Sequence, residues 1–146
     1  MLGESTLVKH SQSSLPLQVL IFFNWHFLVF FFFVNLCLLV YKSVAYYYPG
    51  YYLGWDITIC FLYAIIEGAR LLLASKANKT SQMADMLWSL IFGCAIIVAH
   101  AYYIELQTYV LRVDLVINSI AFVIVGLEMI LGGITYAQYV MAKRMY

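Results

Sequence analysis

The chain has 146 residues, of which 65% are hydrophobic and only 10% are charged, and its formal net charge at pH 7 is +1. A soluble domain carries about a quarter charged residues, so these proportions exclude an ordinary soluble domain and indicate that lipid surrounds most of the chain. The nearly neutral balance supplies no basic surface for nucleic acid, and we expect no nucleic-acid partner. The length leaves room for one compact domain.

Four long apolar segments follow a polar N-terminal tail. The tail covers residues 1–16 and ends at Pro16, which suits the first turn of a helix. Each apolar segment is long enough to cross the roughly 30 Å hydrocarbon core of a bilayer. The sequence therefore predicts an all-α membrane protein, a four-transmembrane-helix bundle over residues 17–140, with a C-terminal tail at 141–146. The predicted spans lie at about 17–41, 52–74, 86–106 and 113–140.

The connections between the predicted spans differ in composition. The first surrounds Pro49 and Gly50, which break a helix, and its five tyrosines together with Trp55 fit an aromatic belt at the membrane interface. A polar loop is predicted over 75–85, and a short turn over 107–112 leads into the fourth span.

The lysines and arginines predict the orientation. With four spans, both termini and the middle loop share one side of the membrane. That side carries five basic residues, and the opposite side carries two. The positive-inside rule therefore predicts cytosolic termini. A glycosylation motif at Asn78 then faces the cytosol, and we expect no glycan there. The five basic residues are Lys9, Lys76, Lys79, Lys143 and Arg144, and the two are Lys42 and Arg112.

Ionisable residues inside the spans cost about 2.5–3.5 kcal/mol each at mid-depth, so each needs a partner or a purpose. At about 1.5 Å of rise per residue, five polar side chains fall in one layer nearer the cytosol. They are Asn24, His26, Glu67, Arg70 and Glu128. Glu67 and Arg70 share a helix face, and we expect Arg70 to bridge Glu67 and Glu128. The alternative is that Arg70 extends to the headgroups and Glu128 packs in its protonated form.

A second polar set is predicted nearer the luminal side. Interfacial solvation accounts for most of its members, and Asp114 also offsets the dipole at the start of the fourth helix. His26 and His100 differ in depth by about two helical turns, which argues against a shared haem. Nucleophile–base pairs, phosphate loops and metal-ligand spacings are absent from the sequence, so we expect no enzyme, no cofactor and no metal. The luminal set comprises Asn35, Asp56, His100, Glu105, Arg112, Asp114 and Asn118.

Short strings in a fixed order carry a family resemblance. Ser-Leu-Pro-Leu-Gln at 14–18 precedes the first span, Ile-Glu-Gly-Ala-Arg-Leu at 66–71 closes the second, and Leu-Gln-Thr-Tyr-Val-Leu-Arg at 106–112 follows the third. Together they resemble the family of transmembrane proteins 17, 80 and 216, over about residues 14–137. Ala77 departs from the pattern, since the family commonly has glycine before the asparagine of the middle loop.

The resemblance implies a non-enzymatic role in the ciliary transition zone. Members of that family belong to a complex with tectonic-like, Meckel-syndrome and B9-domain proteins. The complex supports cilium assembly and gates the entry of membrane proteins into the cilium. The family has no catalytic residues to carry over, and no small-molecule substrate is expected. The competing hypothesis from the residues themselves is a small proton- or ion-coupled transporter that uses Glu128 and Glu67.

Overall fold

A computed structural model describes residues 13–145 and confirms the all-α fold. Residues 1–12, most of the predicted N-terminal tail, lie outside the described residues. Four helical segments, the third of them α3 continued by η1, are long and apolar enough to cross a membrane. The elements are α1 (Leu15–Ala45), α2 (Tyr52–Thr80), α3 (Met83–Ala101), a short π-helix η1 (Tyr102–Leu106) and α4 (Arg112–Met145).

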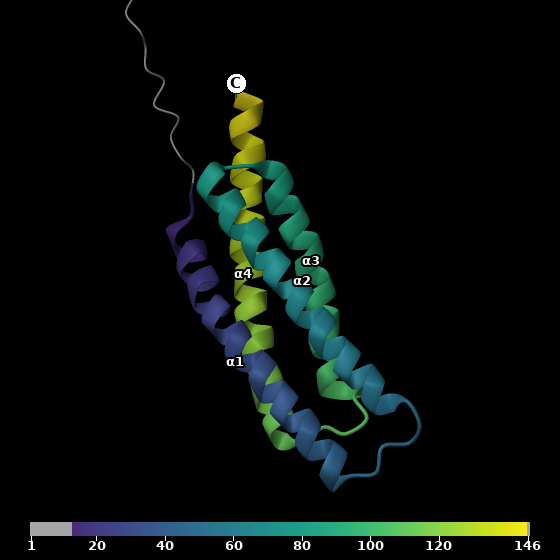
Figure 1. The fold of residues 1–146 in the computed structure, drawn as a ribbon. Coiled ribbons are helices and arrows are strands. Elements are labelled where there is room, and N and C mark those ends of the chain that lie inside the picture. Colours follow the sequence, from purple (N-terminus) through teal and green to yellow (C-terminus); the bar gives the residue numbers. More distant parts are fainter. Residues whose placement is uncertain (1–12, 146) are drawn as a thin grey trace, which may run out of the picture.

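The helices form an up-and-down bundle (Figure 1). The start of α1, the α2–α3 connection and the C-terminal end of α4 lie at one end, and the α1–α2 and η1–α4 connections lie at the other. Each helix packs against two neighbours: α1 and α3 both pack against α2 and against α4. Short connections between antiparallel helices are typical of such bundles.

The helices extend beyond the predicted span limits. An apolar run indicates the part of the chain that lies in the bilayer, whereas the helix itself can continue into polar residues beyond that run. The loop predicted over 75–85 shortens to Ser81 and Gln82. Ser81 adopts a left-handed conformation with φ of 53°, and the Gln82 amide donates to the carbonyl of Ala77 at 3.2 Å. This pairing is the usual way to satisfy the last carbonyls of a helix. Ala77 therefore lies inside α2, and α4 likewise continues through most of the predicted C-terminal tail.

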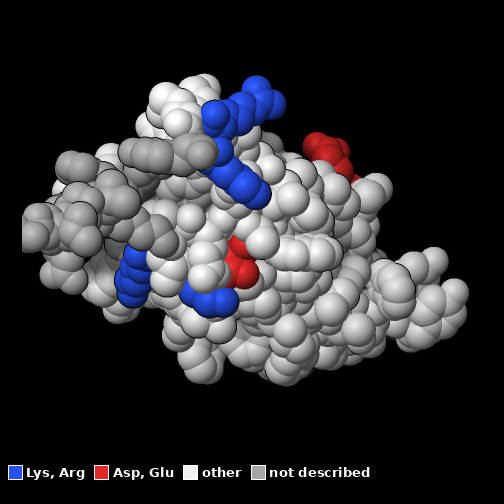
Figure 2. All heavy atoms as spheres, turned by 90° about the horizontal axis from the view of Figure 1, so that it is seen from above, with Lys and Arg blue, Asp and Glu red and all other residues white. Residues whose placement is uncertain are grey.

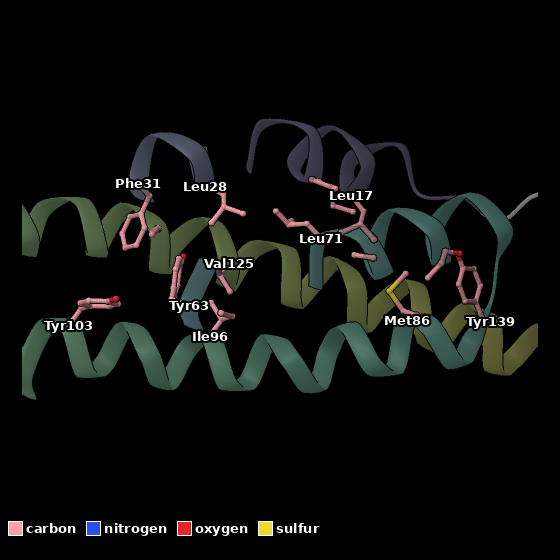
Figure 3. Packing of buried hydrophobic residues seen from close by; sticks show 14 residues of the cluster. Leu17, Leu28, Phe31, Tyr63, Leu71, Met86, Ile96, Tyr103, Val125 and Tyr139 are labelled. Atoms are coloured by element: carbon pink, nitrogen blue, oxygen red, sulfur yellow. The ribbon is translucent and has the colours of Figure 1, made fainter. Parts of the chain in front are cut away.

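The apolar core runs along the axis shared by the four helices (Figure 3). Near the α1–α2 connection it is aromatic: the ring of Phe31 lies 4.9 Å from that of Tyr63 and 6.1 Å from that of Tyr103, between centroids. Towards the opposite end, Met86 and Tyr139 fill the space between helices. Large hydrophobic side chains also cover the outer surface, as expected where lipid is the solvent.

Gly93 on α3 leaves room for the side chain of Met129 on α4. A Cβ atom at this position would collide with the Met129 sulfur. Small residues are enriched where helices pack together in a membrane, where lipid removes the usual hydrophobic driving force.

Candidate functional site: polar layers inside the bundle

Polar and charged side chains are buried within the bundle, where hydrocarbon surrounds it. The buried acidic, lysine and arginine side chains, with their hydrogen-bond partners, fall into two layers along the bundle. The Arg70 layer, about halfway along the bundle, comprises Asn24, Glu67, Arg70 and Glu128. The Lys42 layer, at the end that holds the α1–α2 connection, comprises Lys42, Tyr48, Asp56, Tyr102, Gln107 and Asp114.

In the Arg70 layer one guanidinium holds two carboxylates from different helices. Arg70 Nε lies 2.7 Å from Glu67 Oε2, and Nη2 lies 2.6 Å from Glu67 Oε1. Arg70 Nη2 also pairs with Glu128 Oε2 on α4. Such a planar, two-pronged contact suits a guanidinium and not an ammonium. The guanidinium is turned into the bundle and not to the headgroups, since Arg70 is only 2% exposed.

Asn24 extends the Arg70 layer to α1. Its side-chain amide donates to Glu67 Oε1 at 2.9 Å and to Glu128 Oε2 at 3.1 Å. From α3, the Ser89 hydroxyl donates to the backbone carbonyl of Arg70 at 3.3 Å. All four helices therefore meet at this level through hydrogen bonds or ion pairs.

His26 does not join the Arg70 layer, and the prediction that it does is wrong. It is exposed on the outer face of α1, with Nδ1 3.0 Å from the carbonyl oxygen of Phe22. At about 100° per residue, a side chain two positions from Asn24 points to roughly the opposite side of the helix. Asn24 and His26 lie at similar depths in the membrane, but their side chains point to opposite sides of α1.

In the Lys42 layer a buried ion pair ties α1 to α4. Lys42 Nζ lies 2.6 Å from Asp114 Oδ2, and the two side chains are 0% and 1% exposed. Lys42 also donates to Gln107 Oε1 at 3.2 Å, and the Leu111 amide donates to Asp114 Oδ2 at 2.9 Å. The Asp114 carboxylate thus caps the start of α4 as well as pairing with Lys42.

Asp56 on α2 is fully buried in the Lys42 layer and accepts from two phenols. The Tyr102 hydroxyl donates to Oδ1 at 2.6 Å and the Tyr48 hydroxyl to Oδ2 at 3.3 Å. Partial burial, with the nearby Asp56 carboxylate, raises the pKa of Tyr48 above its ordinary value. Tyr48 therefore remains a hydrogen-bond donor at any physiological pH.

Reasoning from the sequence missed four members of the Lys42 layer: Lys42, Tyr48, Tyr102 and Gln107. Lys42 was missed because a lysine at the end of an apolar run is typical of an interfacial charge. The signal was present in the spacing. Phe31, Asn35, Leu39 and Lys42 recur every three or four residues, and all four are buried. Lys42 therefore continues the inward-facing stripe of α1.

The other members of the predicted luminal set divide between core and surface. Asn118 Oδ1 lies 3.1 Å from His100 Nδ1, and His100 Nε2 lies 3.2 Å from the Tyr63 hydroxyl. Both ring nitrogens of His100 are thus engaged within the bundle, while His26 faces outward. Asn35 donates to a carbonyl of its own helix at 2.8 Å. Arg112 and Glu105 are exposed and belong to neither layer.

Hydrogen bonds from the Asn78 side chain link the start of α1 to the end of α2. Its side-chain oxygen accepts from the Ser14 amide at 2.8 Å, and its amide donates to the Ser14 carbonyl at 2.9 Å and to Gln18 Oε1 at 3.3 Å. Asn78 is only 1% exposed, so its amide is committed to this contact. Burial gives a second reason to expect no glycan there.

Comparison with known proteins identifies the family. A family model named Transmemb_17, described as a predicted membrane protein, matches residues 19–125. The chain belongs to the Transmemb_17 family. Transmembrane protein 216 of Bos taurus is 32% identical over 133 residues, which cover 91% of this chain and 94% of the relative. The proteins of the same name from Mus musculus and Danio rerio are 33% and 30% identical, over 87% and 90% of this chain and 90% and 85% of their own lengths.

The Transmemb_17 match confirms the resemblance carried by the short sequence strings. It includes every residue of the Lys42 layer and three of the four residues of the Arg70 layer, Glu128 lying beyond its end. No solved structure matches the chain.

Proposed function

We propose that this protein is a non-enzymatic tetraspan component of the ciliary transition-zone complex, which supports cilium assembly and gates ciliary membrane composition. The observation that carries the proposal is the similarity to transmembrane protein 216, which extends over 94% of the Bos taurus relative. Tectonic-like, Meckel-syndrome and B9-domain proteins are the partners that this role implies. The ciliary role itself rests on the family resemblance.

The interior of the bundle suits a scaffold. The charges of Arg70, Glu67 and Glu128, and those of Lys42 and Asp114, pair with one another and cross-link the helices. Buried polar contacts of this kind favour one arrangement of the helices over alternatives, and a protein whose surface must dock partners needs one fixed arrangement.

The transporter hypothesis has less support. Glu67 and Glu128 are 1% and 2% exposed and are bound by Arg70 and Asn24. A groove of about 300 Å³ lies between α2 and α3, but its lining is apolar and includes neither carboxylate. A solute entering the groove would meet side chains such as those of Trp55, Ile66 and Ala99.

We further propose that both termini face the cytosol. Exposed basic side chains gather at the end that holds the α2–α3 connection and the end of α4, where Figure 2 shows more blue than red among the charged side chains. Lys42 at the opposite end is buried in an ion pair, which leaves Arg112 as the exposed basic side chain among the residues described there. The asymmetry supports the positive-inside orientation. The basic side chains are Lys76, Lys79, Lys143 and Arg144.

Single cysteines should report this orientation. In a variant whose native cysteines are replaced, we expect Tyr51→Cys at the cell surface of intact cells to react with a membrane-impermeant maleimide. Gln82→Cys should react only after the cells are permeabilised. Both positions are exposed and lie at opposite ends of the bundle, so accessibility does not confound the comparison. The opposite pattern would reverse the proposed orientation.

Localisation tests the proposed function directly. A tagged copy in ciliated cells should concentrate in a narrow zone at the base of the cilium, beside markers of the transition zone. Loss of the protein should reduce the number of ciliated cells or admit excluded membrane proteins into the cilium. An even distribution over the endoplasmic reticulum or mitochondria, with the partners expressed, would contradict the assignment.

A further inference from the structure

Polar side chains on the outer face of the bundle must meet hydrocarbon, and most satisfy themselves within their own helix. The Ser119 hydroxyl donates to the carbonyl of Leu115 at 2.7 Å, and the Thr58 hydroxyl donates to that of Gly54 at 2.8 Å. A hydroxyl has one hydrogen to place, so a single bond to the preceding turn leaves it compatible with lipid.

His26 differs because an imidazole has two nitrogens and its own helix can satisfy only one. The carbonyl of Phe22 can only accept, so Nδ1 carries the hydrogen and donates across 3.0 Å. The neutral ring then presents Nε2 as an acceptor, and no hydrogen bond from the residues described reaches that atom. An unpaired polar atom in hydrocarbon costs several kcal/mol in the limit where nothing can bond to it.

The depth of His26 excludes relief by the headgroups. It lies about 14 Å from residue 17, where the predicted span begins, in a hydrocarbon core about 30 Å thick. An imidazole is too short to reach the interface from there, unlike the side chain of lysine or arginine. The donor that Nε2 needs must therefore come from another group at the same depth.

Exposed aromatic and aliphatic side chains share the outward side of α1 with His26 and form what we term the His26 face of α1. They are exposed by between 53% and 60%, and the Phe22 ring packs on the imidazole with centroids 4.8 Å apart. Large aromatic side chains are enriched in the cores of protein interfaces. The His26 face comprises Phe22, His26, Val29, Phe30 and Phe33.

We propose that the His26 face is covered in the membrane by a transmembrane helix of a partner protein, which presents a hydroxyl or side-chain amide donor to His26 Nε2. Interhelical hydrogen bonds from histidine are one of the forces that associate helices in lipid. A second copy of this chain fits poorly, because a two-fold axis through this face would set one Nε2 acceptor against another. The proposal rests on α1 spanning the bilayer and does not depend on the ciliary assignment.

Site-specific photo-cross-linking in cells tests the proposal. A benzophenone amino acid replaces Val29 in the full-length chain, and a matched copy carries it at Val123 on the outer face of α4, which is 59% exposed. We expect a discrete heavier product from position 29. His26→Leu should reduce its yield by roughly three- to twenty-fold, the range that one interhelical hydrogen bond corresponds to. His26→Gln should retain most of it, because the amide oxygen still accepts, and products from position 123 should not change.

The chemistry of the partner is read from the cross-linked peptide. It should be a transmembrane segment of another protein with Ser, Thr, Tyr, Asn or Gln within one helical turn of the linked residue. The proposal is overturned if position 29 gives no product above position 123, if the product contains two differently tagged copies of this chain, or if His26→Leu leaves the yield unchanged. Among the residues described, His26 forms a hydrogen bond only within its own helix. The His26→Leu variant should therefore match the native chain in thermal stability in detergent. If His26→Leu nevertheless unfolds, the peptide from the native chain decides the question alone.

Discussion

Lys42→Met should destabilise the protein by about 3–5 kcal/mol, the usual cost of removing one partner from a buried ion pair. The substitution keeps an unbranched chain only one atom shorter and removes the ammonium that lies 2.6 Å from Asp114 Oδ2. Asp114 would then remain as an uncompensated carboxylate with 1% exposure, and Gln107 would lose its donor. The measurement is thermal or denaturant-induced unfolding of the purified protein in detergent.

Two companion variants make the Lys42 result specific. Arg112→Met removes a basic residue that is exposed near the same end of the bundle, and it should change stability by less than about 0.5 kcal/mol. Adding Asp114→Asn to Lys42→Met should recover part of the loss, because asparagine is neutral and its oxygen can still accept from the Leu111 amide. Equal effects of Lys42→Met and Arg112→Met would show that the Lys42–Asp114 pair contributes nothing measurable.

The sequence predicts the bundle because each span is a long, predominantly apolar run, and it predicts the level of the Arg70 layer because rise per residue converts position into depth. Asn24, Glu67, Arg70 and Glu128 do meet in the structure. Depth says nothing of rotation about the helix axis, however. Depth alone therefore places His26 with Asn24, although the two side chains lie about 200° apart around α1.

The Lys42 layer was harder to predict, because its residues come from the ends of spans and from the connections. Charges near a span end are ordinarily solvated by headgroups, and Lys42 and Asp114 match that pattern in composition. Their pairing depends on how far each helix continues beyond the apolar run. α1 extends to Ala45, which keeps Lys42 on a helical face that points inward. The length of the apolar run does not show how far the helix continues beyond it.

Loss of Arg70 should cost about as much as loss of Lys42, because Arg70 is the cation that pairs with both Glu67 and Glu128 among the described residues in the middle of the bundle. Arg70→Leu leaves Glu67 and Glu128 facing each other across Asn24, so each must take up a proton or draw water inward. We expect a loss of about 3–5 kcal/mol. Lys76→Leu is the control: Lys76 pairs with Asp85 at 2.8 Å but is 59% exposed, and a surface pair contributes about 0–1 kcal/mol.

Arg70→Lys should recover only part of the stability lost in Arg70→Leu. A lysine restores the charge but cannot reproduce the parallel contacts of Nε and Nη2 with the Glu67 carboxylate while also reaching Glu128. Its stability should therefore fall between that of Arg70→Leu and that of the native chain. Full recovery by lysine would show that charge alone matters in this layer.

A double-mutant cycle between Arg70 and Glu128 then separates direct contact from two independent effects. Glu128→Gln on its own removes one of the two carboxylates that Arg70 contacts, and it keeps an oxygen that can accept from Asn24. In the Arg70→Leu background the same substitution removes a stranded charge, so it should raise stability or cost much less than in the native chain. The coupling energy should reach about 1–3 kcal/mol, which is typical of residues in one ion-pair network. Strictly additive losses would mean that the guanidinium does not hold Glu128 in the membrane, and α4 would then depend on Lys42 and Asp114 for its ionic link to the rest of the bundle.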